Sequence, residues 1–256
     1  MVEEMRLFDY EISAEAQTAL QLFKDWKVKA EEIFTIMEVT KPTSYEFVRQ
    51  YHYLGNAKFF ALYSYGLWCE GELVGIAAFS LPQGTSASEG WFGKDANDKS
   101  VLELTRLAML PMLNNTNATS YLLSHSMKML HKDHGVKAVI TLADASRHVG
   151  SIYQVCNFKY YGLADDKSDF YRYPSGKKNV RGSTNGMDGV WIARTKKHRY
   201  AYIMDKSLRC LYQEQTRPTK ANVFNRYCCG GTGVVEDKRT GCRYTCPICT
   251  GKLLKL

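Results

Sequence analysis

The strongest constraint on the fold is an alternation of apolar runs and a helix-like segment in the middle of the chain. Residues 102–110 form an apolar run broken by one charge, Arg106, and residues 136–142 form a second apolar run. Between them, a polar stretch at residues 114–117 is typical of a helix start, and the helical pattern continues to about Lys132. Strand–helix–strand units of this kind close as right-handed crossovers. The pattern predicts an α/β protein with helices flanking a mixed sheet.

Two predicted helices precede these runs. The first covers residues 13–34 with Ser13 as its N-cap, and the second begins near Thr43, which has capping-box spacing to Glu46. Residues 51–53 fall in the last turn of the second helix. The remaining predictions are a hairpin over residues 59–80, loops over 81–100 and 172–198, a helix over 150–158, and strands over 159–161 and 199–204.

The length of 256 residues allows one sizeable domain and a small appendage. We predict a catalytic domain over residues 1–212 and a basic, cysteine-rich module over residues 213–256. No run approaches the roughly 20 apolar residues of a membrane helix. The acidic N-terminus lacks the apolar core of a signal peptide. We therefore expect a cytoplasmic protein without a membrane partner, in which thiols stay reduced.

Positive charge is concentrated in the C-terminal third. Residues 1–170 contain 16 Lys and Arg against 21 Asp and Glu, whereas residues 171–256 contain 18 against 5. Such a block, interleaved with aromatic residues, is typical of nucleic-acid binding, and a flexible solvated tail is the alternative. The residues predicted to contact double-stranded DNA are Lys196, Lys197, Arg199, Arg226, Lys238, Arg239 and Arg243.

Five of the eight cysteines lie within 22 residues near the C-terminus. Cys246 and Cys249 form a CPxC knuckle followed by glycine, a shape in which backbone amides point at metal-bound sulfur. Four thiolates in a tetrahedron suit zinc, and a site closed in this way is structural. Unliganded thiols in a tail are the alternative. The predicted ligands are Cys242, Cys246 and Cys249 with either Cys228 or Cys229.

Two candidate binding positions lie at strand–helix junctions. The helix start near residue 117 offers free N–H groups to a phosphate or carboxylate, with Asn117, Thr119 and Ser120 beside it. Simple N-capping would also explain these residues. Asp144 follows a buried strand, at the edge where α/β sheets place ligands, so it can act as a base or orient an amine. A role in a turn is the alternative.

Four further residues could carry chemistry. Tyr153, on the next short helix, can protonate a leaving group or donate to an oxyanion, although helical tyrosines more often serve packing. Arg106 either faces solvent or reaches an anionic ligand, because a buried unpaired arginine is costly. His52 and Tyr53 could bind a metal or shuttle protons, although a lone histidine is more often structural.

Together these segments resemble known families. Residues 101–162 are similar to the core of GNAT acyltransferases, with a strand, a cofactor-binding helix, a strand, and a closing helix that carries a tyrosine. Within that fold, roughly residues 45–210 most resemble the Mom-type DNA modification proteins of bacteriophages. The motifs are Tyr51-His52-Tyr53-Leu54-Gly55, Glu103-Leu104-Thr105-Arg106-Leu107, Ala143-Asp144-Ala145, Gly150-Ser151-Ile152-Tyr153 and Lys197-His198-Arg199-Tyr200.

The resemblance implies carbamoylmethylation of adenine N6 in double-stranded DNA, which shields phage DNA from restriction in the host cytoplasm. It implies catalytic roles for Arg106, Asp144 and Tyr153, and iron binding or base activation by His52 and Tyr53. A small-molecule acyl donor such as acetyl-CoA would be a partner.

One stretch departs from the GNAT pattern. Ordinary GNAT enzymes have a glycine-rich pyrophosphate loop before the cofactor helix, whereas residues 113–118 here contain no glycine. The identity of the donor therefore stays open.

Two other classes of function also remain open. A plain N-acetyltransferase acting on a protein, a tRNA or a small amine would bind CoA tightly and leave DNA unchanged. A non-enzymatic DNA-binding regulator that has kept the acyltransferase core would show salt-sensitive DNA binding without any product.

Overall fold

The computed structural model describes residues 12–54, 59–82, 87–94, 96, 99–164, 168–179, 183–193, 195–220, 232–250 and 252–256. Its helices are α1 (Ala14–Lys24), α2 (Ala30–Ile33), α3 (Lys41–Tyr51), α4 (Ala87–Phe92), α5 (Ala118–His134), α6 (Ser151–Val155) and α7 (Pro247–Thr250). Its strands are β1 (Thr35–Glu38), β2 (Tyr63–Cys69), β3 (Glu72–Ser80), β4 (Val101–Met109), β5 (Ala138–Asp144), β6 (Lys159–Leu163), β7 (Ser168–Arg172), β8 (Gly189–Ala193), β9 (Lys197–Ile203), β10 (Val234–Glu236) and β11 (Arg243–Thr245).

Within these residues the strands form a seven-stranded sheet in the order β1-β2-β3-β4-β5-β9-β6 and two two-stranded sheets, β7-β8 and β10-β11. The chain divides into two compact units. Unit 1 contains the described residues up to Thr141 together with 155–158 and 201–212, and unit 2 contains those in 142–154, 159–200 and 213–256. The large sheet has antiparallel and parallel neighbours, so the predicted mixed sheet flanked by helices is confirmed.

The N-terminal helices begin and end for local reasons. Ser13 caps α1 as predicted, because its Oγ accepts the N–H of Ala16 at 3.2 Å. The predicted helix over residues 13–34 is nevertheless two helices, since Trp26 takes a left-handed backbone (φ 58°) that an α-helix cannot continue through. Thr40 caps α3, and His52 is its C-cap residue with extended backbone. His52 and Tyr53 therefore lie just beyond the helix, not in its last turn.

The predicted hairpin is confirmed as β2 and β3. Its turn is the pair Glu70–Gly71, both with positive φ (49° and 78°), which is the turn that matches the twist of antiparallel strands. The first strand begins at Tyr63 and not at Phe59.

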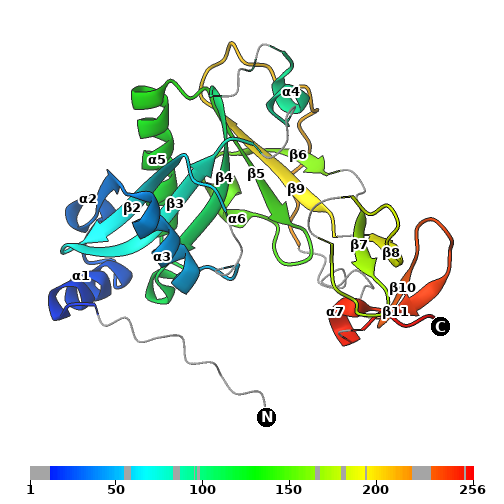
Figure 1. The fold of residues 1–256 in the computed structure, drawn as a ribbon. Coiled ribbons are helices and arrows are strands. Elements are labelled where there is room, and N and C mark those ends of the chain that lie inside the picture. Colours follow the sequence, from blue (N-terminus) through cyan, green and yellow to red (C-terminus); the bar gives the residue numbers. More distant parts are fainter. Residues whose placement is uncertain are drawn as a thin grey trace. The chain divides into compact units, whose positions relative to one another are not determined.

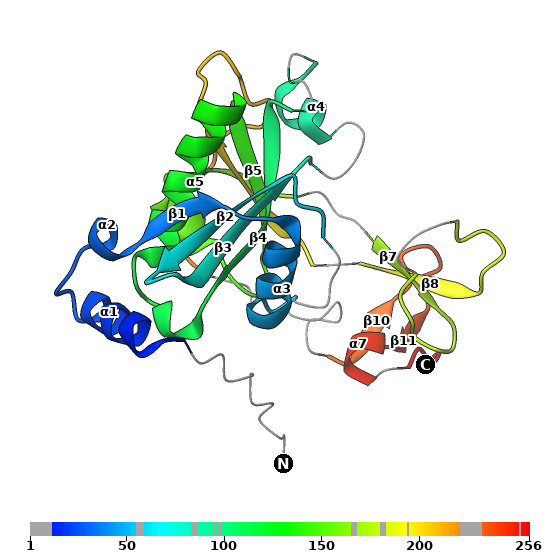
Figure 2. The ribbon, with the colours of Figure 1, turned by 60° about the vertical axis from the view of Figure 1, so that its left-hand side comes forward.

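Helices cover both faces of the sheet in unit 1 (Figures 1 and 2). On one face, a Cβ at Gly75 would lie 2.4 Å from the Met109 Sδ and 3.4 Å from Leu122 of α5, so this face packs against α5. Residues three apart in a strand face opposite ways, so Ala78 and its cross-strand partner Arg106 face the other side, with α3. The sheet thus presents Arg106 toward the end of α3.

The predicted strand–helix–strand unit is also present, as a parallel pair of strands joined by a helix. β4 and β5 pair in parallel over Val101–Glu103 and Ala138–Ile140, and α5 connects them. Gly135 ends α5 in the left-handed conformation typical of a helix C-terminus. In the same unit Cys69 and Cys156 are buried, in agreement with their apolar sequence context.

Two segments predicted as loops contain regular structure. Residues 81–100 include α4, and residues 172–198 include β8, which pairs antiparallel with β7 in unit 2. The signal in β8 is the alternation of Val190 and Ile192, both buried, with partly exposed neighbours. Among the described residues, no helix is both long and apolar enough to cross a membrane.

Two buried tyrosines should respond in opposite directions to loss of the hydroxyl. The Tyr65 hydroxyl is buried without a hydrogen-bond partner among the described residues, whereas the Tyr160 hydroxyl bonds to the His198 Nδ1 at 2.9 Å. We expect Tyr65→Phe to raise the free energy of unfolding by about 1 kcal/mol and Tyr160→Phe to lower it by about 1 kcal/mol. Chemical denaturation of both variants at one pH checks this, and equal losses of stability would contradict it.

Candidate functional site

The first part of the candidate site is Arg106, in unit 1. Its half-buried guanidinium lies 5.0 Å from the Phe59 ring centroid, and its Nη1 donates to the Thr105 carbonyl at 2.7 Å. Burial lowers the pKa of Arg106, while the Tyr53 phenol and the Glu103 carboxylate raise it. A cation held partly out of water in this way favours an anionic or strongly dipolar ligand.

His52 and Tyr53 lie beside this cation. Their rings stack at 4.5 Å, and the Leu54 N–H donates to the His52 Nδ1 at 3.0 Å. Burial, and then repulsion by Arg106, lower the pKa of His52 to about 4. His52 is therefore neutral at pH 7, and because its Nδ1 accepts a hydrogen bond, its ring proton is on Nε2. This side chain is a hydrogen-bond donor through Nε2.

The resemblance implied iron at this position, and the described residues do not fit it. Nδ1 is occupied by the Leu54 N–H, and the tautomer that this bond selects has no free lone pair on Nε2. Among the residues that the structure describes, no group of three or more His, Cys, Asp or Glu side chains could hold a metal ion. We therefore assign His52 no role through iron.

An aromatic rim adjoins the same cation. The Tyr45 and Phe59 rings lie 4.6 Å apart, and the Tyr45 hydroxyl donates to the Phe59 carbonyl. Tyr53, whose phenol raises the pKa of Arg106, is 59% exposed. An exposed aromatic face beside a guanidinium is a group on which nucleic-acid bases stack.

The predicted cofactor residues lie at the start of α5. Asn117 is exposed and occupies the N-cap position, but its side chain makes no capping bond, and the Thr116 hydroxyl accepts the Ala118 N–H at 3.3 Å instead. The Ser120 hydroxyl donates to the Asn117 carbonyl at 2.8 Å. Capping thus belongs to Thr116, and ligand binding by Asn117, Thr119 and Ser120 stays a prediction.

Asp144 ends β5, in unit 2. Its Oδ1 accepts the Ser146 N–H at 3.0 Å and the Ser146 hydroxyl at 2.7 Å, and its Oδ2 lies 3.7 Å from the Arg147 Nε. The turn role that the sequence left open is therefore present. Each carboxylate oxygen has two lone pairs, so these bonds orient the group without exhausting it as an acceptor.

Tyr153, in the same unit, is positioned by a network that the sequence did not predict. Its ring lies 5.5 Å from the ring of Tyr200, whose hydroxyl donates to the Val149 carbonyl and accepts from the Gln154 Nε2 at 3.0 Å. Gln154 also donates to the Pro218 carbonyl at 3.1 Å. The sequence signal for this network was the motif at residues 197–200, which lies on β9, where four consecutive residues including Tyr200 are buried.

Two histidines of unit 2 have contacts that the sequence did not predict. The His148 Nδ1 accepts the Gly150 N–H at 3.2 Å, and the His198 Nδ1 bonds to the Tyr160 hydroxyl. Burial lowers the pKa of both histidines. They are neutral, hydrogen-bonded groups in the same unit as Asp144 and Tyr153.

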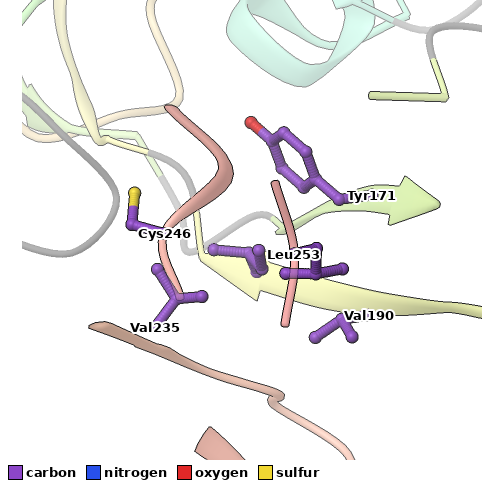
Figure 3. Close-up of a cluster of buried hydrophobic side chains, with 6 residues drawn as sticks. Tyr171, Val190, Val235, Cys246 and Leu253 are labelled. Atoms are coloured by element: carbon purple, nitrogen blue, oxygen red, sulfur yellow. The ribbon is translucent and has the colours of Figure 1, made fainter. Parts of the chain in front are cut away.

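The C-terminal cysteines lie partly outside the described residues, which is the case for Cys228, Cys229 and the side chain of Cys249. Cys242 is partly exposed, and Cys246 is fully buried in a hydrophobic cluster (Figure 3). The cluster joins residues on both sides of the predicted boundary at residue 212, namely Tyr171, Val190, Ile192, Val235, Cys246 and Leu253.

The predicted DNA contacts differ in exposure. Arg226 lies outside the described residues, and Arg199 is buried, with its guanidinium donating to the Leu163 carbonyl at 3.2 Å through Nε. This bond gives Arg199 a role inside unit 2 and not on its surface. The exposed members are Lys196, Lys197, Lys238, Arg239 and Arg243.

The low pKa of His52 predicts a pH effect on stability. Because the folded pKa of about 4 lies below the ordinary value of 6.5, the unfolded chain takes up this proton first as pH falls. The contribution of His52 is fully present above pH 6.5 and is lost between pH 6.5 and 4. We expect His52→Gln to flatten this part of the stability curve, measured by chemical denaturation. Identical slopes in both proteins would contradict it.

Comparisons with known proteins complete the description of the site. The family model described as the Mom protein family matches residues 33–221. No curated protein matches the sequence.

Several solved structures are similar in shape. A ribosomal-protein alanine N-acetyltransferase from Escherichia coli is 16% identical, with 71% of this chain and 100% of that chain covered and a TM-score of 0.42. A GNAT family acetyltransferase from Elizabethkingia anophelis with acetyl-CoA bound is 16% identical, with 67% and 99% covered and a TM-score of 0.40.

Proposed function

Because this chain belongs to the Mom protein family, we propose that it is a transferase that modifies bases in double-stranded DNA. The finer proposal is carbamoylmethylation of adenine N6, the reaction that the motif resemblance implies, with protection of phage DNA from restriction as its consequence. The family match carries this proposal, since it spans the Arg106 region of unit 1 and the Asp144 and Tyr153 segment of unit 2.

The chemistry around Arg106 supports the proposal. The half-buried guanidinium would hold the donor by its polar group, because a charge in a partly dry site acts more strongly than in water. The His52 Nε2–H would donate to a ring nitrogen or carbonyl of a reactant. The exposed Tyr53 ring would stack on a base taken out of the duplex.

The roles proposed for Asp144 and Tyr153 concern the moving protons. Asp144 would accept a proton from the adenine amine or hold that amine in line, and the Tyr153 hydroxyl would donate to the leaving group. In carbamoylmethylation, the adenine N6 would form a bond to the CH₂ carbon of the transferred group as the bond from that carbon to the leaving group breaks, and the donor is a small molecule that carries this group. Acetyl-CoA would instead transfer an acetyl group through its carbonyl carbon and give N6-acetyladenine, so as a donor it fits only the broader proposal of base modification. The α5 N-terminus with Asn117, Thr119 and Ser120 would bind a phosphate or carboxylate of the donor.

A structural zinc ion remains part of the proposal. It rests on the CPxC knuckle and on the density of cysteines in residues 228–249. The ligands would be Cys242, Cys246 and Cys249 with Cys228 or Cys229. Metal analysis of the purified chain should find one zinc per chain, and its removal by a chelator should destabilise the C-terminal segment. If the purified protein contained no zinc, or if the chelator left its stability unchanged, the proposal of a structural zinc ion would be wrong.

The deciding experiment is nucleoside analysis. The chain is expressed in a bacterium, total DNA is digested to nucleosides, and their masses are compared with those from Asp144→Asn cells. Asp205→Asn is a matched control, because the Asp205 Oδ1 accepts the Ser207 N–H at 2.9 Å in the same type of turn. A new deoxyadenosine species in wild type and Asp205→Asn, absent in Asp144→Asn, is expected.

The other outcomes separate the rival functions. Ordinary nucleosides together with tight CoA binding would favour an N-acetyltransferase acting on a protein, a tRNA or a small amine. Ordinary nucleosides together with salt-sensitive DNA binding and no CoA binding would favour a regulator. A new species that persists in Asp144→Asn would remove Asp144 from the mechanism.

A further inference from the structure

The β10–β11 hairpin of unit 2 has a fixed tip. Asp237 is buried, and its Oδ1 accepts the Arg239 N–H at 2.7 Å. Its own N–H donates to the Cys242 carbonyl at 2.9 Å, and its carbonyl accepts the Gly241 N–H at 2.9 Å. These bonds close the tip around one buried carboxylate, so the backbone that carries Lys238 and Arg239 is held in one conformation.

The same tip is attached to β8. The Lys238 N–H donates to the Trp191 carbonyl at 3.0 Å, and the Arg239 guanidinium lies 4.9 Å from the Trp191 ring centroid. Trp191 in turn packs edge-on against Phe170 of β7 at 5.5 Å. Both the backbone and the side chain of Arg239 are therefore positioned by the two strands beneath it.

The Arg239 guanidinium has no hydrogen-bond partner within the described part of the chain. It also makes no ion pair with any residue that the structure describes, so its N–H donors are available to a ligand. A pocket of about 420 Å³ adjoins it, with Thr184, Asn185 and Thr240 among its lining residues. The arrangement is a rigid fork of donors beside a polar recess.

Among the base edges of DNA, such a fork has one specific partner. Guanine presents two acceptors, O6 and N7, in the major groove, and a bidentate arginine is their commonest partner. The major groove is wide enough for a two-stranded ribbon, and residues 171–256 carry 18 Lys and Arg against 5 Asp and Glu. A guanidinium also binds a phosphate in bidentate fashion, but phosphates carry no sequence information, so a sequence preference that depends on Arg239 separates the two ligands.

We propose that the β10–β11 hairpin enters the major groove of the DNA substrate and that Arg239, held against Trp191, reads a guanine there. Lys238 and Arg243, both exposed on the same hairpin, contact the flanking phosphates. This inference rests on the proposed function for its ligand, duplex DNA, and adds a determinant of sequence preference outside the residues proposed for catalysis.

The test compares Arg239→Lys with Arg172→Lys in the full chain. Both substitutions keep the positive charge, and both positions are exposed in unit 2, but Arg239 lies against the Trp191 ring, whereas Arg172 donates to the Asn179 side chain at 3.0 Å and has no proposed contact with DNA. Random duplexes are bound, recovered and sequenced, and affinities are measured over a range of salt. We expect wild type and Arg172→Lys to enrich a motif with one guanine position that Arg239→Lys loses. Affinity for that motif should fall about 10-fold or more in Arg239→Lys, with unchanged salt dependence.

Retention of the wild-type motif by Arg239→Lys, equal effects of the two variants, or a wild type that binds without any preferred sequence would overturn the inference. The proposed function is tested separately, by the nucleoside analysis. If wild type bound a sequence motif that depends on Arg239 but produced no modified nucleoside, the role of the hairpin in recognition would stand and only the proposed catalytic activity would be overturned.

Discussion

Arg106→Lys is expected to lower the rate of DNA modification about 100-fold or more while the chain stays folded. Lysine keeps the charge, but it has no planar group to lie on the Phe59 ring while donating to the Thr105 carbonyl. Its compact ammonium is also more strongly hydrated, so it is less suited to a half-buried position. The measurement is the yield of modified nucleoside per cell at matched protein level, with thermal unfolding to confirm folding.

Arg49→Lys is the matched control for this variant. Arg49 lies on α3, and its guanidinium is exposed and pairs only with Glu46, at 2.7 Å, within the described residues. An exposed pair of this kind contributes little to stability, so neither stability nor modification should change. If Arg106→Lys and Arg49→Lys gave the same yield, Arg106 would have no role in binding the donor.

Gly150→Ala is expected to cost both stability and activity. Gly150 has a φ of 71°, which L residues rarely adopt, and an added Cβ would lie 2.8 Å from ring carbons of both Tyr153 and Tyr200. Tyr200 is fully buried and bonded to the Val149 carbonyl, so the Tyr153 ring is the one that must move. Misplacing a reacting group by about 1 Å can lower a rate by about 100-fold.

Gly135→Ala separates the backbone effect from the steric one. Gly135 has nearly the same φ, 65°, but a Cβ there meets nothing within 4 Å. We expect a loss of about 1–2 kcal/mol with full activity for Gly135→Ala, and a further loss of about 1–3 kcal/mol for Gly150→Ala. Denaturation curves and nucleoside yields measure the two effects. Equal activity in both variants would show that the position of Tyr153 does not matter.

The sequence predicts the layout of unit 1 well, because the governing interactions are local. Ser13 caps its helix through a neighbour three residues away, and the Glu70–Gly71 turn needs only two residues with positive φ. The error at the start of α3 is also local. Pro42 in the first turn indicates a start at Lys41, and Glu46 pairs with Arg49 and does not complete a capping box with Thr43.

The candidate site is harder to predict, since its parts act through tertiary contacts. Sequence reasoning left Arg106 either facing solvent or reaching a ligand, and only the packing of Phe59 and α3 on its face makes it half-buried. The tautomer of His52 follows from where the chain turns after α3, which no motif specifies. β8 was missed because its partner β7 lies beyond a long polar segment without a two-residue turn signal.

The shared cluster under β7 and β8 limits how the C-terminal segment can be studied. A chain shortened to residue 212 would lose Val235, Cys246 and Leu253, and it would leave Tyr171, Val190 and Ile192 facing water. Newly exposed apolar strands of this kind promote aggregation. If such a truncated chain no longer bound DNA, the cause could equally be unfolding of unit 2 or the loss of a residue that contacts DNA. Surface substitutions such as Arg239→Lys therefore separate recognition from folding where deletion cannot.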